Sequence, residues 1–312
     1  MGVVTVSEET LAAEFDEHRG HLVGVAYRIT GTRADAEDAV QDAWLRLAGL
    51  TAAARAEIRD LRAWLTTAVG RLCLDRLKAA SAQRERYVGS WLPEPVVAPL
   101  VSPAGEDPLD VAVRDDGLRM AALVVLHELS PEQRVAFVLH DAFGVPFPEI
   151  AQSLGTTPAA ARQLASRARK AVAEADAPPR VELGEQRQVL ESFVAALASG
   201  DVAGLLKLLH PDVVVVGDSG GKARTARRPV LGAEKTARFL FGLVRKYGGP
   251  EVLASALRTV LVNGDLGFLA RSDGDEDHQA VERRVGTLAI RDGLVVAIYD
   301  VANPDKLTRV PS

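Results

Sequence analysis

Four basic side chains lie in one short segment near the middle of the chain. Residues 156–172 contain Arg162, Arg167, Arg169 and Lys170 and no acidic residue. Guanidinium and ammonium groups bind phosphate oxygens, and an arginine can also bind the edge of a guanine through two hydrogen bonds. The segment therefore predicts a nucleic-acid contact. The alternative is a solvated basic face on a helical hairpin.

The elements expected to position these side chains form a helix-turn-helix. Ser130-Pro131-Glu132-Gln133 predicts a helix start with a capping box, and Gly144-Val145-Pro146 predicts its end. A short helix is expected from about Phe147 to the glycine at 155. Thr157 is then the expected N-cap of a helix that runs from Pro158 to about residue 172. A short helix, a glycine-containing turn and a second helix are typical of DNA-binding proteins.

The last helix is expected to divide its contacts between bases and backbone. Residues near the start of a recognition helix reach base edges, and later residues meet phosphates. We expect Ala159, Arg162 and Gln163, next to Pro158, to enter the groove. The backbone contacts are expected from Ser166, Arg167, Arg169 and Lys170.

A second group of polar residues lies on a predicted acidic helix. Asp35 and Asp38 fall in its first turn, where the helix dipole favours negative charge. Val40, Trp44 and Leu47 form a predicted buried stripe. The other face offers Asp38, Gln41, Asp42 and Arg46. From chemistry alone, a plain solvated face is the favoured interpretation of these residues.

The next predicted helix is basic. Residues 55–90 hold eight basic and four acidic side chains, whereas residues 1–54 hold four basic and nine acidic ones. Its expected core stripe is Leu61, Trp64, Leu65, Ala68 and Leu72. Arg71, Asp75 and Lys78 share another face, followed by Arg84 and Arg86. Backbone attraction beside aromatic surfaces suits single-stranded DNA.

These motifs resemble those of ECF (extracytoplasmic-function) RNA polymerase sigma factors. Residues 35–46 are similar to the helix of region 2 that binds core polymerase, and residues 61–78 to the helix that opens and recognises the −10 element. Residues 130–172 resemble region 4, which recognises the −35 element. Two positions depart from the family: Arg71 stands where many members have Asn, and Leu164 where many have a basic residue. Because of Arg71, the resemblance implies no particular base preference at the −10 element. Because of Leu164, it does not imply the phosphate contact that a basic residue makes at that position.

Two further motifs resemble a subgroup of that family. Trp91-Leu92-Pro93-Glu94-Pro95 and Asn303-Pro304-Asp305-Lys306-Leu307 are similar to signatures of ECF sigma factors with a SnoaL-like C-terminal extension, the actinobacterial SigJ type. Residues 218–222 resemble a degraded form of the subgroup's glycine-rich motif. The two pentapeptides motivate a hypothesis of regulation in cis, in which the C-terminal domain packs against the linker around residues 91–95.

The chain of 312 residues is expected to be multidomain. The prediction is two all-α domains, region 2 at 1–90 and region 4 at 118–177, followed by an α+β SnoaL-like cone-shaped domain at 183–312. Residues 91–117, rich in proline and acids, are expected to be a semi-extended linker without packing. The lone Cys73 is expected in the core. No signal peptide or membrane span is predicted, so we expect a cytoplasmic protein.

The C-terminal segment has the pattern of helices followed by a curved antiparallel sheet. Helices are expected at 185–199, 202–209 and 233–247, and a buried strand at 213–216. Two hairpins are expected at Asn263-Gly264 and Asp292-Gly293, because both dipeptides tolerate positive φ. Candidate polar groups for a proton-transfer site are His210, Asp212, Asp218, Tyr247, Tyr299 and Asp300.

The sequence therefore predicts an alternative sigma factor that is not an enzyme. Its expected partners are core RNA polymerase, through the beta' and beta subunits, and promoter DNA; its C-terminal domain leaves room for an unknown small-molecule ligand. The net charge of −5 suits a protein that binds DNA strongly only when docked on polymerase. No cofactor, metal or catalytic residue is expected. The alternatives are a ligand-responsive helix-turn-helix regulator, and an isomerase or hydrolase activity in the C-terminal domain.

Overall fold

The computed structural model describes residues 8–84, 87–100, 118–272 and 280–310. These residues form two compact units. Of the described residues, the first contains 8–82 and 123–176. The second contains 83–84, 87–100, 118–122, 177–272 and 280–310. Within the part of the chain that is described, no helix is both long and apolar enough to cross a membrane.

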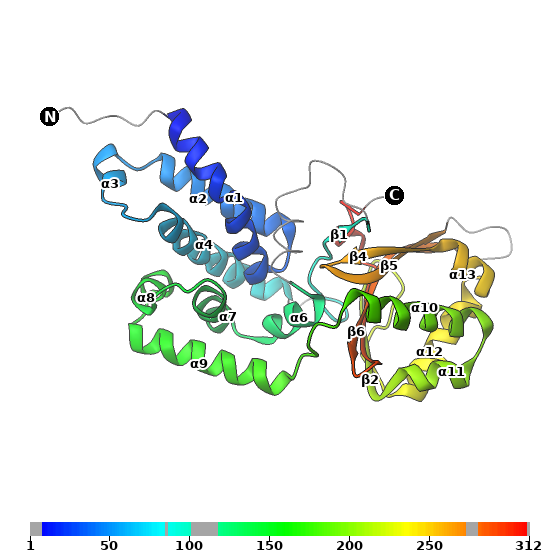
Figure 1. Cartoon of the computed structure of the whole chain (residues 1–312). Coiled ribbons are helices and arrows are strands. Elements are labelled where there is room, and N and C mark those ends of the chain that lie inside the picture. Colours follow the sequence, from blue (N-terminus) through cyan, green and yellow to red (C-terminus); the bar gives the residue numbers. More distant parts are fainter. Residues whose placement is uncertain (1–7, 85–86, 101–117, 273–279, 311–312) are drawn as a thin grey trace. The chain divides into compact units, whose positions relative to one another are not determined.

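The first unit is helical (Figure 1). Its elements are α1 (Glu8–Thr30), α2 (Arg33–Ala48), α3 (Ala52–Ala56), α4 (Leu61–Arg84), α6 (Met120–Glu128, which begins in the second unit), α7 (Pro131–Phe137), the π-helical turn η1 (Val138–Ala142), α8 (Phe147–Leu154) and α9 (Pro158–Ala175).

The predicted helix-turn-helix is present, with the predicted caps. Ser130 and Gln133 form a reciprocal capping box at the start of α7. Gly155 ends α8 in the left-handed conformation, with φ 63°. The Thr157 hydroxyl accepts a hydrogen bond from the Ala160 amide and so caps α9. The π-helical turn after α7 was not predicted, since nothing in the periodicity marks it.

Packing of the first unit confirms most of the predicted core. Val40, Leu47, Leu65 and Leu72 are buried, and so is Cys73, where burial raises the pKa of the thiol. Trp44, Leu61, Trp64 and Ala68 are only half-buried, so the prediction that these four belong to the buried stripes is wrong. Gly70 lets α4 approach η1 closely: a Cβ there would lie 2.7 Å from Leu139 Cδ1.

The second unit is built on one curved, seven-stranded sheet with the order β1-β4-β5-β6-β7-β2-β3. Both predicted hairpins are confirmed, since Asn263 and Asp292 adopt φ values of 53° and 52° in their turns. The strands are β1 (Val97–Ala98), β2 (Leu209–Asp218), β3 (Val230–Leu231), β4 (Leu257–Val262), β5 (Asp265–Ser272), β6 (Val281–Arg291) and β7 (Leu294–Val301).

The expectation of a purely antiparallel sheet is wrong for one pair of strands. β2 runs parallel to β7, with Val215 opposite Ile298 and Asp218 opposite Val301. Parallel neighbours need a long connection. Here the chain between β2 and β7 includes a helical segment and the whole β4–β6 meander. Local strand patterns in the sequence do not reveal that β2 and β7 pair across this long connection.

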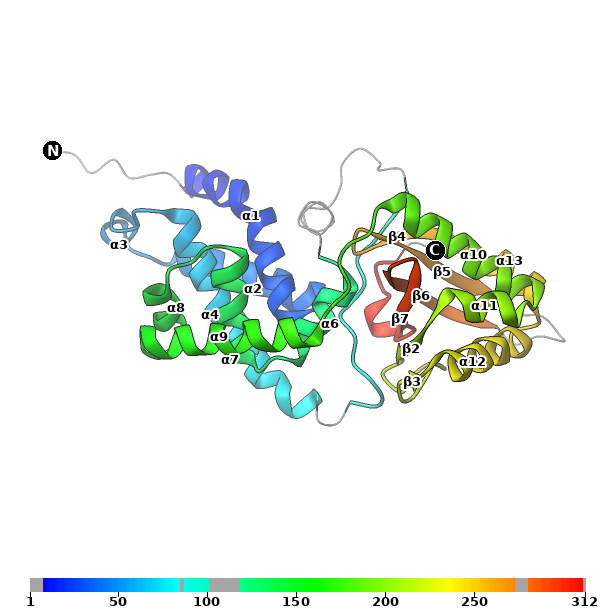
Figure 2. The same ribbon diagram turned by 60° about the horizontal axis from the view of Figure 1, so that its bottom comes forward.

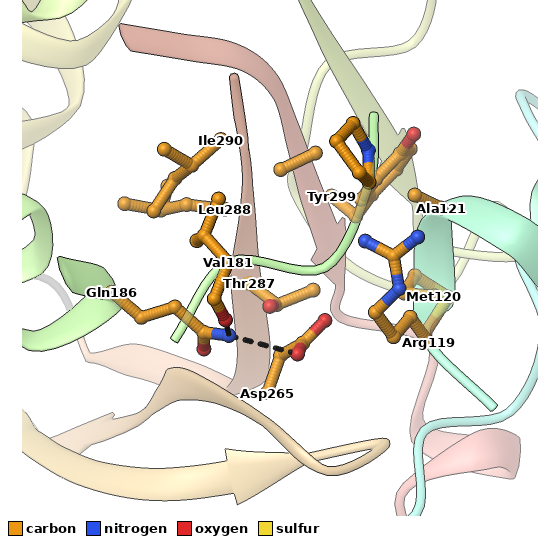
Figure 3. Close-up of a pocket in the computed structure, with 12 residues that line it drawn as sticks. Arg119, Met120, Ala121, Val181, Gln186, Asp265, Thr287, Leu288, Ile290 and Tyr299 are labelled. Carbon is orange, nitrogen blue, oxygen red and sulfur yellow. Dashed lines mark hydrogen bonds between the residues drawn. The ribbon is translucent and has the colours of Figure 1, made fainter. Parts of the chain in front are cut away.

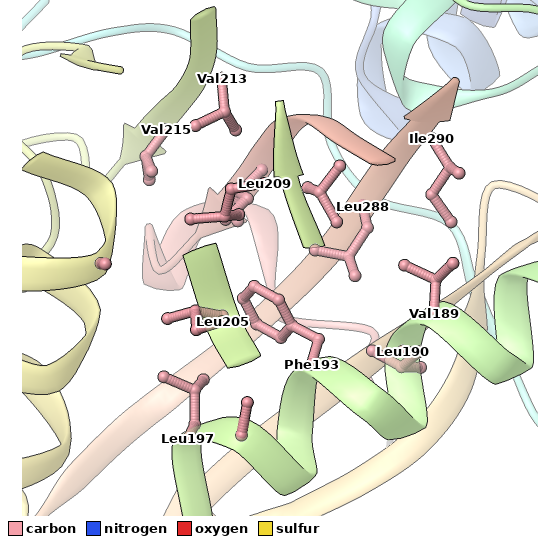
Figure 4. Packing of buried hydrophobic residues seen from close by; sticks show 14 of the residues in the cluster. Val189, Leu190, Phe193, Leu197, Leu205, Leu209, Val213, Val215, Leu288 and Ile290 are labelled. Carbon is pink, nitrogen blue, oxygen red and sulfur yellow. The ribbon is translucent and has the colours of Figure 1, made fainter. Parts of the chain in front are cut away.

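Helices cover one face of this sheet (Figure 2). Phe193 and Leu197 of α10 pack with Leu205 of α11 against strand residues such as Val215 and Leu288 (Figure 4). The helices are α10 (Leu183–Ser199), α11 (Val202–Leu208), α12 (Ala233–Lys246) and α13 (Pro250–Ala256), with a 3-10 turn η2 (Pro304–Lys306) after β7. α13 was not predicted.

The predicted unpacked linker is wrong for its first residues. Leu92 is 0% exposed and Val96 4% exposed, and β1 pairs with β4 at the sheet edge. Asn263 exchanges hydrogen bonds with the Val96 backbone, donating at 2.8 Å and accepting at 3.3 Å. Proline content and charge describe how stiff a segment is, but not whether a neighbouring surface binds it. Residues 101–117 lie outside the described residues.

Candidate nucleic-acid interface

α9 has two sharply different faces. Ala161, Ala165 and Ala168, spaced by four and three residues, are completely buried. All eight side chains expected to contact DNA at the −35 element are exposed: Pro158, Ala159, Arg162, Gln163, Ser166, Arg167, Arg169 and Lys170. Small buried residues hold the helix close to α7 and α8, and its opposite, basic face stays available to a groove.

Three basic groups of this face have partners within the unit. The Arg162 guanidinium lies 5.5 Å from the centre of the Phe147 ring. Arg169 forms an ion pair with Asp141 at 2.6 Å, and Lys170 a longer one with Glu174 at 3.7 Å. Surface ion pairs of this kind contribute only about 0–1 kcal/mol, so they can be exchanged for phosphate contacts.

The basic face of α4 is also exposed. Arg71, Asp75 and Lys78 all face solvent, and Lys78 lies 3.1 Å from Glu132 of α7. Arg84 ends α4, and Arg86 lies outside the described residues. The structure therefore brings Arg71, Asp75 and Lys78 onto one face, as their spacing predicts.

An open cavity of about 490 Å³ lies beside this face. Its wall includes the half-buried Trp64 and the exposed Arg71 of α4, together with Glu149 of α8. The Thr67 hydroxyl is 3.5 Å from Glu149 Oε2, and the Ser153 hydroxyl donates to the Thr67 carbonyl at 3.3 Å. An aromatic ring beside guanidinium groups can stack a base, but here three acidic residues, Glu57, Asp60 and Glu149, share the wall.

α2 shows a mixed surface. Asp38, Gln41 and Arg46 are exposed, whereas Asp42 is tied to Arg76 at 2.7 Å and Asp35 to the capping Thr32 hydroxyl at 2.5 Å. An open groove of about 420 Å³ runs between α1 and α2. Its wall includes Phe15 and Trp44, whose rings are 5.2 Å apart, and Leu45 nearby is 58% exposed.

In the second unit, Asp218 gathers the two predicted regulatory motifs. Its Oδ2 accepts hydrogen bonds from the Leu92 amide at 2.8 Å and from Lys306 Nζ at 2.7 Å. Its Oδ1 accepts from the Tyr87 hydroxyl at 2.5 Å. The carboxylate is 0% exposed, so these donors replace its water shell. We call this set, Tyr87, Leu92, Asp218, Asn303 and Lys306, the Asp218 clasp.

Lys306 completes the clasp from the C-terminal side. Its ammonium also donates to the Leu92 carbonyl and lies 4.0 Å from the centre of the Trp91 ring. Asn303 Nδ2 donates to the Tyr87 hydroxyl at 2.8 Å, and burial together with Asp218 raises the pKa of Tyr87. Glu94, Pro304 and Asp305 are not buried, while Pro93, Pro95 and Leu307 are. The two pentapeptides, residues 91–95 and 303–307, therefore contribute to the same contact surface.

A small cavity beside β6 and β7 is lined by polar and apolar side chains (Figure 3). Gln186 Nε2 donates to Asp265 Oδ1 at 3.0 Å, and Arg119 and Tyr299 lie nearby. Burial raises the pKa of Asp265 and raises that of Tyr299 to about 12. The space is only about 10 Å³, enough for about one water molecule. It is a packed junction with no room for a substrate.

The candidate proton-transfer residues do not converge as one set. Asp218 belongs to the clasp, Tyr299 to the small cavity, and His210 and Asp212 to the start of β2. Only Tyr247 and Asp300 line the same cavity. Sequence reasoning missed Arg284 beside them, and it missed Tyr87 in the clasp. Among the described residues no cluster of His, Cys, Asp and Glu could hold a metal ion.

Sequence reasoning also missed Arg134, which lies in the first unit. This side chain of α7 is 1% exposed and donates to the carbonyls of Ile29 at 2.9 Å and His127 at 2.9 Å. It therefore joins the end of α1 to the helix-turn-helix. No sequence signal distinguishes such an arginine from a DNA-binding one, because only its neighbours decide its role.

Comparison with known proteins agrees with this organisation. The family model of Sigma-70 region 2 matches residues 15–83, and that of Sigma-70, region 4 matches residues 119–172. The chain is 50% identical over 304 residues to the ECF RNA polymerase sigma factor SigJ of Mycobacterium tuberculosis (strain ATCC 25618 / H37Rv), covering 96% of this chain and 94% of that protein.

Two further matches agree. The chain is 38% identical over 207 residues to the probable ECF RNA polymerase sigma factor SigI of the same strain, covering 66% of this chain and 69% of that protein. The crystal structure of the Mycobacterium tuberculosis sigma factor SigJ matches with a TM-score of 0.79 and 50% identity, over 95% of this chain and 98% of that chain. The predicted resemblance is therefore confirmed, and the chain belongs to the family of ECF RNA polymerase sigma factors.

Proposed function

We propose that this ECF sigma factor directs core RNA polymerase to promoters through three exposed faces, and that its C-terminal domain regulates this step in cis. Transcription initiation follows from the family. The assignment of each step to particular residues is our proposal. Because the protein works on RNA polymerase, we also propose that it acts in the cytoplasm.

The polymerase contact is assigned to α2. Asp38 and Gln41 offer polar groups in the open groove between α1 and α2, and Arg46 is exposed farther along α2. Leu45 and the half-buried Trp44 add apolar surface, and a polar rim around such a patch is typical of a protein interface. Asp35 and Asp42 are included in this contact because of their position on α2. Their carboxylates already bind Thr32 and Arg76. We propose that the beta' and beta subunits bind here.

The two DNA contacts are assigned to α4 and α9. The observation that carries this assignment is the division of α9 into a buried alanine face and an exposed basic face. Arg162 and Gln163 would recognise bases of the −35 element, and Arg167, Arg169 and Lys170 its phosphates. On α4, Arg71 and Lys78 would attract the melted −10 strand, with Trp64 as the stacking surface.

Regulation in cis is assigned to the Asp218 clasp. The segment held by the clasp, residues 87–98, directly follows α4 in the sequence and leads toward the helices of region 4. The clasp holds this segment through a buried ion pair and backbone hydrogen bonds. We propose that the closed clasp restricts the linker and so limits how the two DNA-binding regions can engage a promoter.

The test is run-off transcription with core polymerase on a promoter library. It compares the full chain with a chain ending near Pro179 and with the Lys306→Met variant. Lys207→Met, an exposed lysine of α11, is the matched control. Specific initiation by any form supports the sigma activity. A difference between the full chain and both altered forms supports regulation through the clasp, and identical activity of all four proteins would contradict it.

Two other functions would use parts of the same chain. A ligand-responsive repressor would use the helix-turn-helix without polymerase; membership of the sigma family argues against it, and failure to bind core polymerase would favour it. An isomerase or hydrolase would need converging acid and base groups, and only Tyr247 and Asp300 share a cavity. ECF sigma factors as a class are not enzymes, and we infer the same for this chain.

A further inference from the structure

The C-terminal domain contains a second cavity, between its helices and the sheet. Its volume is about 80 Å³, several times what one water molecule needs. Most of its wall is apolar, with side chains from α10, α12 and the sheet: Phe193, Leu197, Phe239, Leu240, Leu243 and Phe268. Such a space suits a compact apolar molecule, because apolar walls hold water poorly.

Two charged side chains line this cavity among the apolar ones. Arg284 of β6 is 7% exposed and Asp300 of β7 is 8% exposed. Gly286 lies directly opposite Asp300 in the sheet, so Arg284, two residues away, is its diagonal neighbour on the same face. Arg284 Nε lies 3.5 Å from Asp300 Oδ1.

The outer atoms of this pair are satisfied, but the inner ones are not. Arg284 Nη2 donates to the Arg224 carbonyl, and Asp300 Oδ2 accepts from the Thr225 hydroxyl at 2.5 Å. Arg284 Nε and Asp300 Oδ1, in contrast, are buried and have no hydrogen-bond partner among the described residues. A buried donor and a buried acceptor left side by side are costly to a fold unless something bonds to both.

We propose that this cavity binds a small, uncharged apolar molecule that carries a hydroxyl group. One hydroxyl can accept a hydrogen bond from Arg284 Nε and donate one to Asp300 Oδ1. The ion pair is neutral as a whole, so an anionic ligand would bring an uncompensated charge into an apolar wall. The apolar body of the ligand would lie against Leu240, Leu243 and Phe268.

The proposal separates this site from the clasp and from any promoter activity. It concerns binding alone, so failure of the transcription experiment would leave it standing, and its own failure would leave the sigma assignment standing.

The experiment is a titration of the full-length protein with phenol, toluene and benzoate. These probes share one ring and differ in the polar group. Binding is measured by isothermal titration calorimetry and by ligand-observed NMR. Phenol is expected to bind about tenfold or more tightly than toluene, because two hydrogen bonds to charged groups are gained. Benzoate is expected to bind more weakly than phenol.

Two variants with matched controls locate the site. Leu240→Trp fills the cavity and should abolish binding of phenol and toluene; Leu231→Trp, on the exposed strand β3, should leave both unchanged. The double variant Arg284→Met with Asp300→Leu should bring the two affinities together, whereas Arg258→Met on β4 should not.

Several results would overturn the proposal. These are equal affinity for phenol and toluene in the native protein, tighter binding of benzoate, no saturable binding of phenol up to its solubility limit, or binding that persists in Leu240→Trp. If the double variant fails to fold, as judged by near-ultraviolet circular dichroism, the Leu240→Trp and Leu231→Trp pair decides alone.

Discussion

Asp218 shows how one residue organises a regulatory surface. Its carboxylate accepts hydrogen bonds from a backbone amide, a phenol and an ammonium, which come from opposite ends of the second unit in sequence. A buried carboxylate is stable only when such donors surround it. Each donor is therefore needed. If one donor is lost, the negative charge of the buried Asp218 carboxylate is no longer fully balanced by the remaining donors.

The Lys306→Met variant tests this dependence at the residue scale. It leaves Asp218 buried without its counter-ion, so the free energy of unfolding of the C-terminal domain should fall by about 3–5 kcal/mol. Lys222→Met is the matched control, because Lys222 pairs with Asp305 at the exposed surface and should cost less than about 1 kcal/mol. Urea denaturation measures both. Equal losses would show that the clasp is no stronger than a surface pair.

Asp265 gives a prediction about pH. Burial raises the pKa of its carboxyl above the usual 3.8, so the folded state holds the proton more tightly than the unfolded chain does. The stability linked to this group is complete below the usual value and is lost as pH rises through the raised pKa. Asp265→Asn cannot ionise. It should therefore unfold at a higher temperature than the native protein at pH 7, and the difference should vanish in acid. A variant that is less stable than the native protein at pH 7 would refute this expectation.

At the scale of single elements, α9 presents a basic surface, and the segment after β2 connects two sites. The buried alanines of α9 bring a basic face to the surface. Residues 219–229 follow the clasp residue Asp218, and Arg224 and Thr225 among them bind Arg284 and Asp300 of the second cavity. One short segment thus connects the clasp with the cavity wall.

The two kinds of DNA contact on α9 can be told apart. Arg162→Ala should relax the preference for one base pair of the −35 element and cost about 1–3 kcal/mol on the best site. Arg167→Ala should weaken binding to all sequences by a similar factor and reduce the salt dependence by about one phosphate contact. Binding of the holoenzyme to a promoter library at two salt concentrations measures both. Uniform loss for Arg162→Ala would make Arg162 a phosphate contact.

At the scale of whole units, the two sigma regions pack together within the first unit. Arg134 bonds to the end of α1, Leu139 lies against Gly70, and Ser153 bonds to Thr67. As a result, α8 places Glu149 on the wall of the cavity beside Trp64. In this arrangement the surface assigned to the −10 strand is shared with an acidic side chain.

The Glu149→Gln variant tests that arrangement. Removing the charge keeps the size of the side chain but ends its repulsion of phosphate, so the free protein should bind single-stranded −10 DNA more tightly at low salt. The gain should shrink as salt screens the charge. Glu14→Gln is the control, since Glu14 is exposed on α1 and does not belong to the wall of this cavity. Fluorescence anisotropy measures both affinities, and unchanged binding of Glu149→Gln would mean that α8 does not limit access.

The sequence by itself determined the local elements and their chemistry. Caps at Ser130 and Thr157, the left-handed Gly155 and the two hairpin dipeptides act through bonds between near neighbours, so their signals are complete within a few residues. The basic face of α9 followed from the same periodicity. Family membership followed from motifs, and the comparisons confirm it.

Only the tertiary structure decided which distant groups meet. The burial of residues 91–98, the parallel pairing of β2 with β7, the role of Arg134 and the Arg284–Asp300 pair all depend on residues far apart in the chain. A charged side chain has the same local pattern whether it faces water or a buried partner. Its role is set by the neighbours that folding supplies, because desolvation and partner geometry decide whether that charge is tolerated.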